Sequence, residues 1–148
     1  MTSIRFVRLW FALVAIVLVG GCSGYKFAER ETYPVSGSAS YRGEPIAGGT
    51  VTLHPVSPVD DGKPFVIPKA VVKPDGSFSF TTYRSNDGAP LGDYMVAFSW
   101  KGILEDVNAD DAEEMDEQLP EEYLDPKTSG VRVTIAKGDN TLPKFELN

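Results

Sequence analysis

The sequence predicts an all-β fold, a sandwich of seven short strands, and two observations point to it. Short segments carry apolar residues at every second position, as half-buried strands do. The 14 glycines and 11 prolines recur between those segments at nearly regular spacing, which is typical of the turns of β-sandwiches. The expected strands are residues 33–41, 49–55, 70–73, 77–83, 93–100, 131–135 and 144–147.

The first two expected strands each have one apolar face. In the first, Val35, Gly37 and Ala39 lie on the same side, and the glycine allows another backbone to approach closely. In the second, Val51 and Leu53 alternate with polar residues. Both segments therefore predict strands that bury one side against a core.

Proline and glycine mark the next turns. Residues 57–68 contain several of each and predict a loop. Pro74-Asp75-Gly76 separates the third and fourth strands and is the strongest hairpin signal in the chain, because proline fixes φ and glycine supplies a positive φ. Residues 86–92 form another glycine- and proline-rich turn before the fifth strand.

The fifth strand is expected to be the central core strand. Tyr94, Val96, Phe98 and Trp100 alternate with smaller or polar residues and share one face. After it, an acidic segment at residues 105–122 predicts a loop or a short helix at 110–118. Two short strands then close the predicted sandwich.

The first 21 residues have the three zones of a cleaved signal helix. Arg5 and Arg8 give a basic start, residues 9–19 are apolar, and glycines precede Cys22. The apolar run is shorter than the roughly 20 residues that span a bilayer as a helix. Residues 1–21 are therefore expected to be a leader rather than a permanent transmembrane anchor.

Val19-Gly20-Gly21-Cys22 resembles the lipobox of bacterial lipoproteins. The resemblance implies an exported protein with an acylated Cys22 that holds it at an envelope membrane. Residues 23–32 are polar and lack an apolar pattern, so residues 22–32 are expected to be a tether to a domain over 33–148. Ser23 after the cysteine implies the outer membrane. The alternative is an ordinary cleaved signal that leaves Cys22, the only cysteine, as a free thiol.

The charge of the chain excludes nucleic acid as an expected partner. The formal net charge is −7, and no basic stripe is present to neutralise phosphates. The acidity is concentrated in one segment without lysine or arginine, which holds ten carboxylates: Glu105, Asp106, Asp110, Asp111, Glu113, Glu114, Asp116, Glu117, Glu121 and Glu122.

Residues 35–51 resemble the opening of carboxypeptidase regulatory-like domains, and so does the Asp75-Gly76-Ser77-Phe78 hairpin. The run Asp87-Gly88-Ala89-Pro90 and residues 119–131 extend the likeness to a group of small bacterial lipoproteins. The resemblance implies a transthyretin-like (prealbumin-like) Greek-key sandwich. It implies no activity, because this fold hosts unrelated functions.

Catalytic chemistry is not predicted. His54 is the only histidine and lies on the outward side of its strand, so a surface role is expected for it. One histidine and one cysteine are too few for a histidine and cysteine zinc site or for the iron of intradiol dioxygenases. No catalytic residue and no cofactor is therefore assigned.

Two binding candidates remain. Carboxylates suit calcium, so Asp110, Asp111, Glu113 and Glu114 are candidate ligands, although their spacing is not that of an EF-hand. Trp100 is a candidate binding residue because it ends its strand beside Lys101 and Gly102.

The expected function is a non-enzymatic structural or binding module of the cell envelope, with the membrane as its partner through Cys22. Three alternatives stay open. One is an accessory domain that recognises a carbohydrate or peptide, and another is an uncharacterised hydrolase using paired carboxylates. The third is a domain whose free strand edge accepts a strand from another envelope protein.

Overall fold

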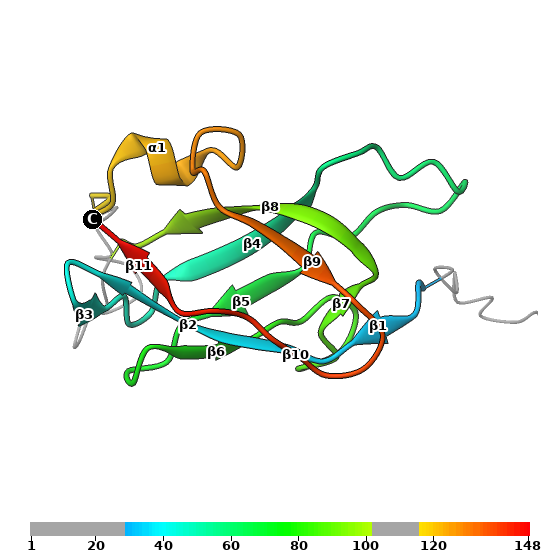
Figure 1. Cartoon of the computed structure of the whole chain (residues 1–148), viewed down its shortest axis with the longest axis horizontal. Helices are drawn as coiled ribbons and strands as arrows, with labels where there is room; N and C mark the ends of the chain where they lie inside the picture. Colours follow the sequence, from blue (N-terminus) through cyan, green and yellow to red (C-terminus); the bar gives the residue numbers. More distant parts are fainter. Residues whose placement is uncertain (1–28, 102–115) are drawn as a thin grey trace, which may run out of the picture.

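Strands in sheets dominate the computed structural model, which describes residues 29–101 and 116–148 (Figure 1). Within these residues the one helix, α1, covers only Glu121–Leu124. The predicted all-β class is therefore confirmed. The strands are β1 (Thr32–Tyr33), β2 (Val35–Tyr41), β3 (Glu44–Pro45), β4 (Thr50–Pro55), β5 (Lys69–Val71), β6 (Ser77–Ser79), β7 (Ala89–Pro90), β8 (Gly92–Ser99), β9 (Arg132–Ile135), β10 (Asn140–Thr141) and β11 (Phe145–Leu147).

One sheet has the strand order β5-β4-β8-β9, and every neighbouring pair is antiparallel. Its longest pairing joins β4 to β8 and sets Val51 opposite Phe98 and Leu53 opposite Val96. These four side chains are buried, so the period of two read from the sequence corresponds to the inner face of this sheet.

A second sheet is built around β2, and β1 pairs with β7 in a third, two-stranded antiparallel sheet. β6 pairs with β2 in antiparallel fashion, whereas β10 and β11 pair with it in parallel, one after the other. Gly37 of β2 faces Phe78 of β6 in this register, and a Cβ at Gly37 would lie 2.6 Å from the Phe78 ring. The glycine is therefore required by close packing, as the sequence predicted.

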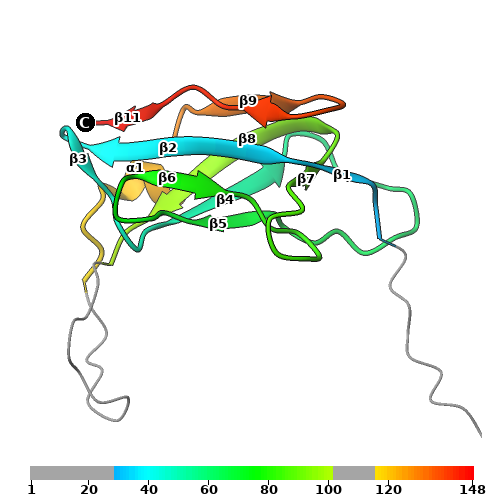
Figure 2. The ribbon, with the colours of Figure 1, turned by 90° about the horizontal axis from the view of Figure 1, so that it is seen from below.

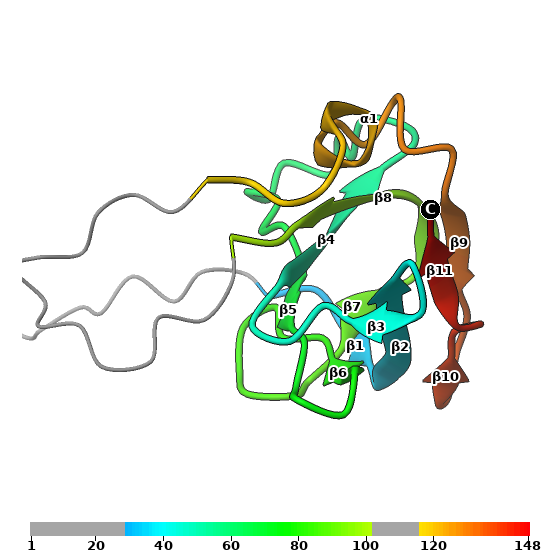
Figure 3. The ribbon, with the colours of Figure 1, turned by 90° about the vertical axis from the view of Figure 1, so that its left-hand side faces the viewer.

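The buried faces of the two larger sheets meet in a single core. Figure 3 shows the strands of these sheets end on. Phe145 of β11 joins the layers: its ring centroid is 5.3 Å from that of Phe98 on β8 and 6.1 Å from that of Phe78 on β6. Both distances lie in the favourable range for aromatic pairs.

The fourth expected strand, residues 77–83, ends earlier than predicted. β6 stops at Ser79, and only an isolated bridge at Thr81 follows. The reason is Asp87, whose carboxylate accepts hydrogen bonds from the backbone N–H groups of residues 82, 83 and 84 at 2.7–3.0 Å. These donors are turned toward a side chain and are not available to a neighbouring strand.

The leader at residues 1–21 lies outside the described residues, and so do residues 110–115 of the expected helix at 110–118. Residues 116–118 are described and are not helical, while α1 begins three residues later. No helix in the described ranges is long and apolar enough to cross a membrane.

The molecule has two distinct ends, which Figure 2 shows at opposite sides. The tether end contains Glu29, where the described chain starts, and the loop over residues 56–68. The acidic end contains Trp100, which follows β8, and Glu117 of the acidic segment. β8 runs from one to the other, and its eight residues span roughly 23 Å at about 3.3 Å per residue.

Candidate functional site

A groove lies at the tether end, between the loop that follows β4 and the start of β8. It has a volume of about 450 Å³ and is lined by residues 55–61 and 91–94. A neighbouring hollow of about 250 Å³ shares Val56, Asp93 and Tyr94 with it and extends to β9. The groove falls within the usual size range of ligand sites.

Backbone and side-chain hydrogen bonds fix the floor of the groove. The N–H of Val56 donates to the carbonyl of Asp93 at 2.9 Å, and the hydroxyl of Thr134 donates to the Asp93 carboxylate. The buried Tyr94 hydroxyl donates to the carbonyl of Pro90 at 2.9 Å. Burial raises the pKa of Tyr94 to about 12, so this hydroxyl remains protonated at neutral pH.

Arg30 connects the start of the described chain to the loop over residues 56–68 beside the groove. Its guanidinium forms an ion pair with Asp61 and donates to the carbonyls of Lys63 and Pro64 at 3.0 and 2.8 Å. It also stacks over Phe65, with 5.3 Å between the guanidinium carbon and the ring centroid. The hydrogen bond from Arg30 holds the pKa of Asp61 below its usual value. The loop and the end of the expected tether are therefore one unit.

Apolar side chains stand exposed around this unit. Each is between 38 and 46% exposed, and we call the set the apolar loop surface: Val56, Val59, Val66, Ile67 and Leu91. Scattered single apolar residues are common on protein surfaces, but five on one loop and the adjoining strand start are characteristic of a contact surface. The groove therefore offers aliphatic walls rather than the exposed aromatic rings that stack on sugars.

Trp100, the predicted binding residue, is only partly exposed. Its indole packs against the core and donates a hydrogen bond to the carbonyl of Ala47 at 3.0 Å. The backbone N–H of Trp100 donates to the Glu117 carboxylate at 2.6 Å, and the Ser99 hydroxyl donates to the same group at 2.7 Å. Trp100 thus serves as an anchor at the base of the acidic segment.

Glu117 closes that base. The N–H of Gln118 donates to the carbonyl of Trp100 at 2.9 Å, so the backbone after β8 is paired with the acidic segment at this point. Partial burial alone would raise the pKa of Glu117, but hydrogen bonds from Trp100, Ser99 and Leu119 outweigh it and lower the pKa. This carboxylate is therefore ionised and structural.

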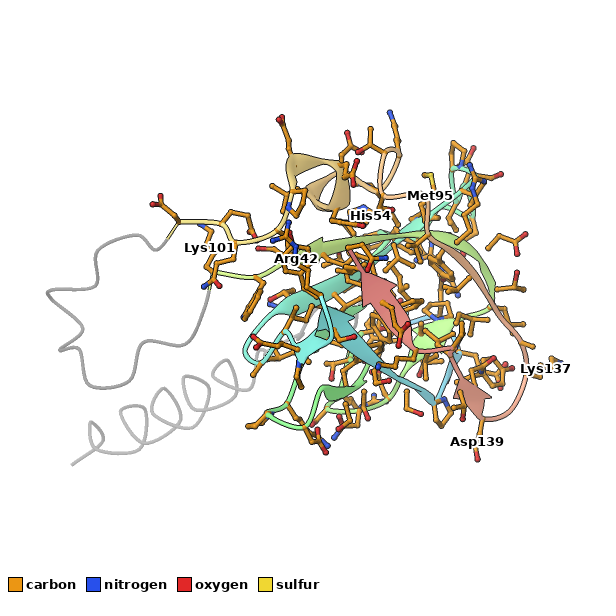
Figure 4. All side chains as sticks on the ribbon, turned by 60° about the vertical axis from the view of Figure 1, so that its left-hand side comes forward. Arg42, His54, Met95, Lys101, Lys137 and Asp139 are labelled. Atoms are coloured by element: carbon orange, nitrogen blue, oxygen red, sulfur yellow. The ribbon has the colours of Figure 1, made fainter. Side chains whose placement is uncertain are left out.

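His54 lies on the outer face of its sheet beside Met95, its partner across β4 and β8, as Figure 4 shows. The side chain is partly buried rather than fully solvated, and Nε2 is 3.0 Å from the Thr52 hydroxyl. Burial lowers the pKa of His54, and the nearby Asp125 carboxylate opposes this only in part. The predicted surface position is thus observed, with less solvent contact than expected.

Cys22 and the calcium candidates Asp110, Asp111, Glu113 and Glu114 lie outside the described residues. Within residues 29–101 and 116–148, no three histidine, cysteine or acidic side chains are grouped so as to hold a metal ion. Among the described strands, β9 pairs with β8 alone, whereas β5 at the other edge is also bridged to Thr81. β9 is therefore the more open edge.

Searches against protein-family models, curated proteins and solved structures found no match.

Two residues of these sites could not be identified from the sequence. Arg30 lies in a polar stretch without periodicity, and Glu117 is one of the ten acidic residues of the acidic segment. Both act on partners remote in the chain, since Arg30 binds Asp61 and Glu117 binds Trp100. Only the folded arrangement distinguishes them from their neighbours.

Proposed function

We propose that this protein is a bacterial envelope lipoprotein, which is exported with the leader at residues 1–21 and held at a membrane through an acylated Cys22. Ser23 after the cysteine favours the outer membrane. The observation that carries the proposal is the order of basic residues, apolar run, small residues and the only cysteine. Two or more acyl chains anchor a protein stably, because each buried methylene contributes about 0.8 kcal/mol.

The domain is proposed to act as a non-enzymatic binding or structural module. The roles of its carboxylates support this. Asp61 binds Arg30, Asp75 accepts hydrogen bonds from Ser77, and Asp87 holds the turn after β6. The pKa values of Asp61 and Asp75 are lowered by these hydrogen bonds, which favours fixed anions over groups that exchange protons during a reaction.

A Greek-key sandwich of the transthyretin-like kind is the architecture we propose. Strand neighbours that are not consecutive in the chain, such as β4 beside β8 and β2 beside β6 and β11, are what Greek-key connections produce. The aromatic contact of Phe98 with Phe145 between the sheets is consistent with sandwich packing.

Intact-mass spectrometry of the detergent-extracted native protein tests the anchor. The wild-type chain is compared with the Cys22→Ser variant. A species that starts at Cys22 and carries added acyl mass, absent from the variant, is the expected result. An unmodified wild-type species recovered without detergent would refute the anchor and leave Cys22 as a free thiol.

A further inference from the structure

The position of the apolar loop surface relative to Cys22 is the starting observation. Cys22 and Glu29 are seven residues apart, and a fully extended chain covers at most about 25 Å over that number of residues. If Cys22 is acylated, Glu29 therefore lies within about 25 Å of the membrane. Arg30 then binds Asp61 and the carbonyls of Lys63 and Pro64, which brings the loop to the same place.

We propose that the apolar loop surface rests on the lipid surface and orients the domain there; this inference depends on the proposed acylation of Cys22. Val56, Val59 and Leu91 project from the end of the molecule that the anchor holds close to lipid. Aliphatic side chains at such a position gain by entering the boundary between headgroups and acyl chains. The anchor supplies the attachment, and the loop supplies the orientation.

The charges of the tether end fit this occupant. The two basic residues near Glu29 are paired, Arg30 with Asp61 and Arg84 with Glu29. Lys137 and Asp139, of opposite sign, stand at this end and away from Lys101, as Figure 4 shows. The groove lining adds Asp60, Asp61 and Asp93, of which Asp61 is paired with Arg30 and Asp93 accepts a hydrogen bond from Thr134. The end therefore presents apolar side chains among charges of both signs, most of which have a partner within the protein.

The acidic end is held away from that surface. Gly92 adjoins the groove and Ser99 touches Glu117, so the length of β8, roughly 23 Å, separates the two ends. The Debye length at physiological ionic strength is about 8 Å, so repulsion between Glu117 and anionic lipids is screened over this distance. The acidic end then faces away from the membrane, where it is free for other contacts.

Fluorescence quenching by brominated lipids tests the proposed orientation. The mature protein, which starts at Cys22 and lacks Trp10, is purified from membranes with its anchor and reconstituted into liposomes of phosphatidylethanolamine and phosphatidylglycerol, with or without bromine on the acyl chains. Val59→Trp places a reporter on the apolar loop surface. Val71→Trp is the matched control, because Val71 is 57% exposed and lies at the acidic end, opposite Thr50 and hence level with Ser99.

The expected result is that brominated lipid quenches Val59→Trp, while Val71→Trp and the wild type, whose Trp100 is at the acidic end, lose no fluorescence. Leu91→Trp gives a second reporter if Val59→Trp fails to fold. Anchored protein in which the loop reporters are quenched no more than Val71→Trp would overturn the orientation and leave the anchor standing. Protein that carries no acyl mass and does not sediment with liposomes would overturn both.

Two further outcomes identify another occupant and also overturn the proposal. A loop reporter whose emission changes with protein concentration in the absence of brominated lipid indicates a second copy of this chain. A loop reporter that brominated lipid does not quench, but whose emission changes when a synthetic apolar peptide is added, indicates that the groove binds peptide and not the membrane.

Discussion

Replacing Gly88 by alanine tests the glycine at which an added Cβ would meet the shortest distance among the described glycines. Gly88 has φ of +83°, and a Cβ there would lie 1.7 Å from the carbonyl oxygen of Tyr33. Contacts of Cβ below 3.0 Å do not occur in practice, so the two backbones must separate by more than 1 Å. This movement would open the short ladder of β1 with β7, in which Tyr33 faces Ala89.

Gly43→Ala is the matched control, because Gly43 has φ of +87° and no atom lies within 4 Å of its added Cβ. It carries only the strain of an L-residue in the left-handed region, about 1–2 kcal/mol. Gly88→Ala adds overpacking, about 1–3 kcal/mol, and about 1 kcal/mol for a lost hydrogen bond. We therefore expect Gly88→Ala to lower the free energy of unfolding by about 2–4 kcal/mol more than Gly43→Ala.

Urea unfolding of the mature protein, followed by the fluorescence of Trp100, measures both variants against the wild type. If Gly88→Ala and Gly43→Ala lower the free energy of unfolding equally, the steric explanation is refuted, and β1 and β7 separate without an energetic cost.

Three other changes are each expected to have a defined effect. Glu117→Gln should weaken the loss of stability at acid pH. The lowered pKa of Glu117 stabilises the fold above the pKa of about 4.3 that the residue has in the unfolded chain, and this stability is lost as pH falls through the folded pKa. Parallel urea-stability curves against pH for variant and wild type would contradict this. The pKa of His54, measured by NMR titration, should lie below its usual value of about 6.5. Because the unfolded state then binds the proton at a higher pH than the folded state, the free energy of unfolding should fall as pH drops below about 6.5. A measured pKa above that value would contradict the role of burial. Trp100→Phe removes the hydrogen bond to Ala47 and should cost about 1 kcal/mol by circular dichroism in urea, whereas an unchanged midpoint would show that water replaces the indole.

Local signals in the sequence were enough to locate the main strands. Alternation at Val51 and Leu53 predicted β4. The predicted turn at Pro74-Asp75-Gly76 is present, but the predicted hairpin is not, because β5 pairs with β4 in one sheet and β6 pairs with β2 in another. The alternation and the turn are both short-range features, since side chains alternate along one strand and turn residues fix φ over a few bonds. The buried positions of Tyr94, Val96 and Phe98 follow from the same period.

Features that depend on remote partners could not be predicted in this way. β1 and β7 are two residues each and exist as strands only because they pair. The end of β6 depends on the carboxylate of Asp87, eight residues after Ser79. At the candidate site, the loop beside the groove is held by the ion pair of Arg30 with Asp61, and no sequence pattern around either residue predicts this pair. Long-range hydrogen bonds leave no periodic trace in the chain.

The parallel pairing of β2 with β11 sets an order of events during folding. Ala39 lies opposite Phe145, 106 residues later, and Phe145 is the aromatic residue that joins the layers. Closing a loop of that length costs about 4 kcal/mol of chain entropy. Because the chain is synthesised from its N-terminus, this core cannot close until β11 has been made.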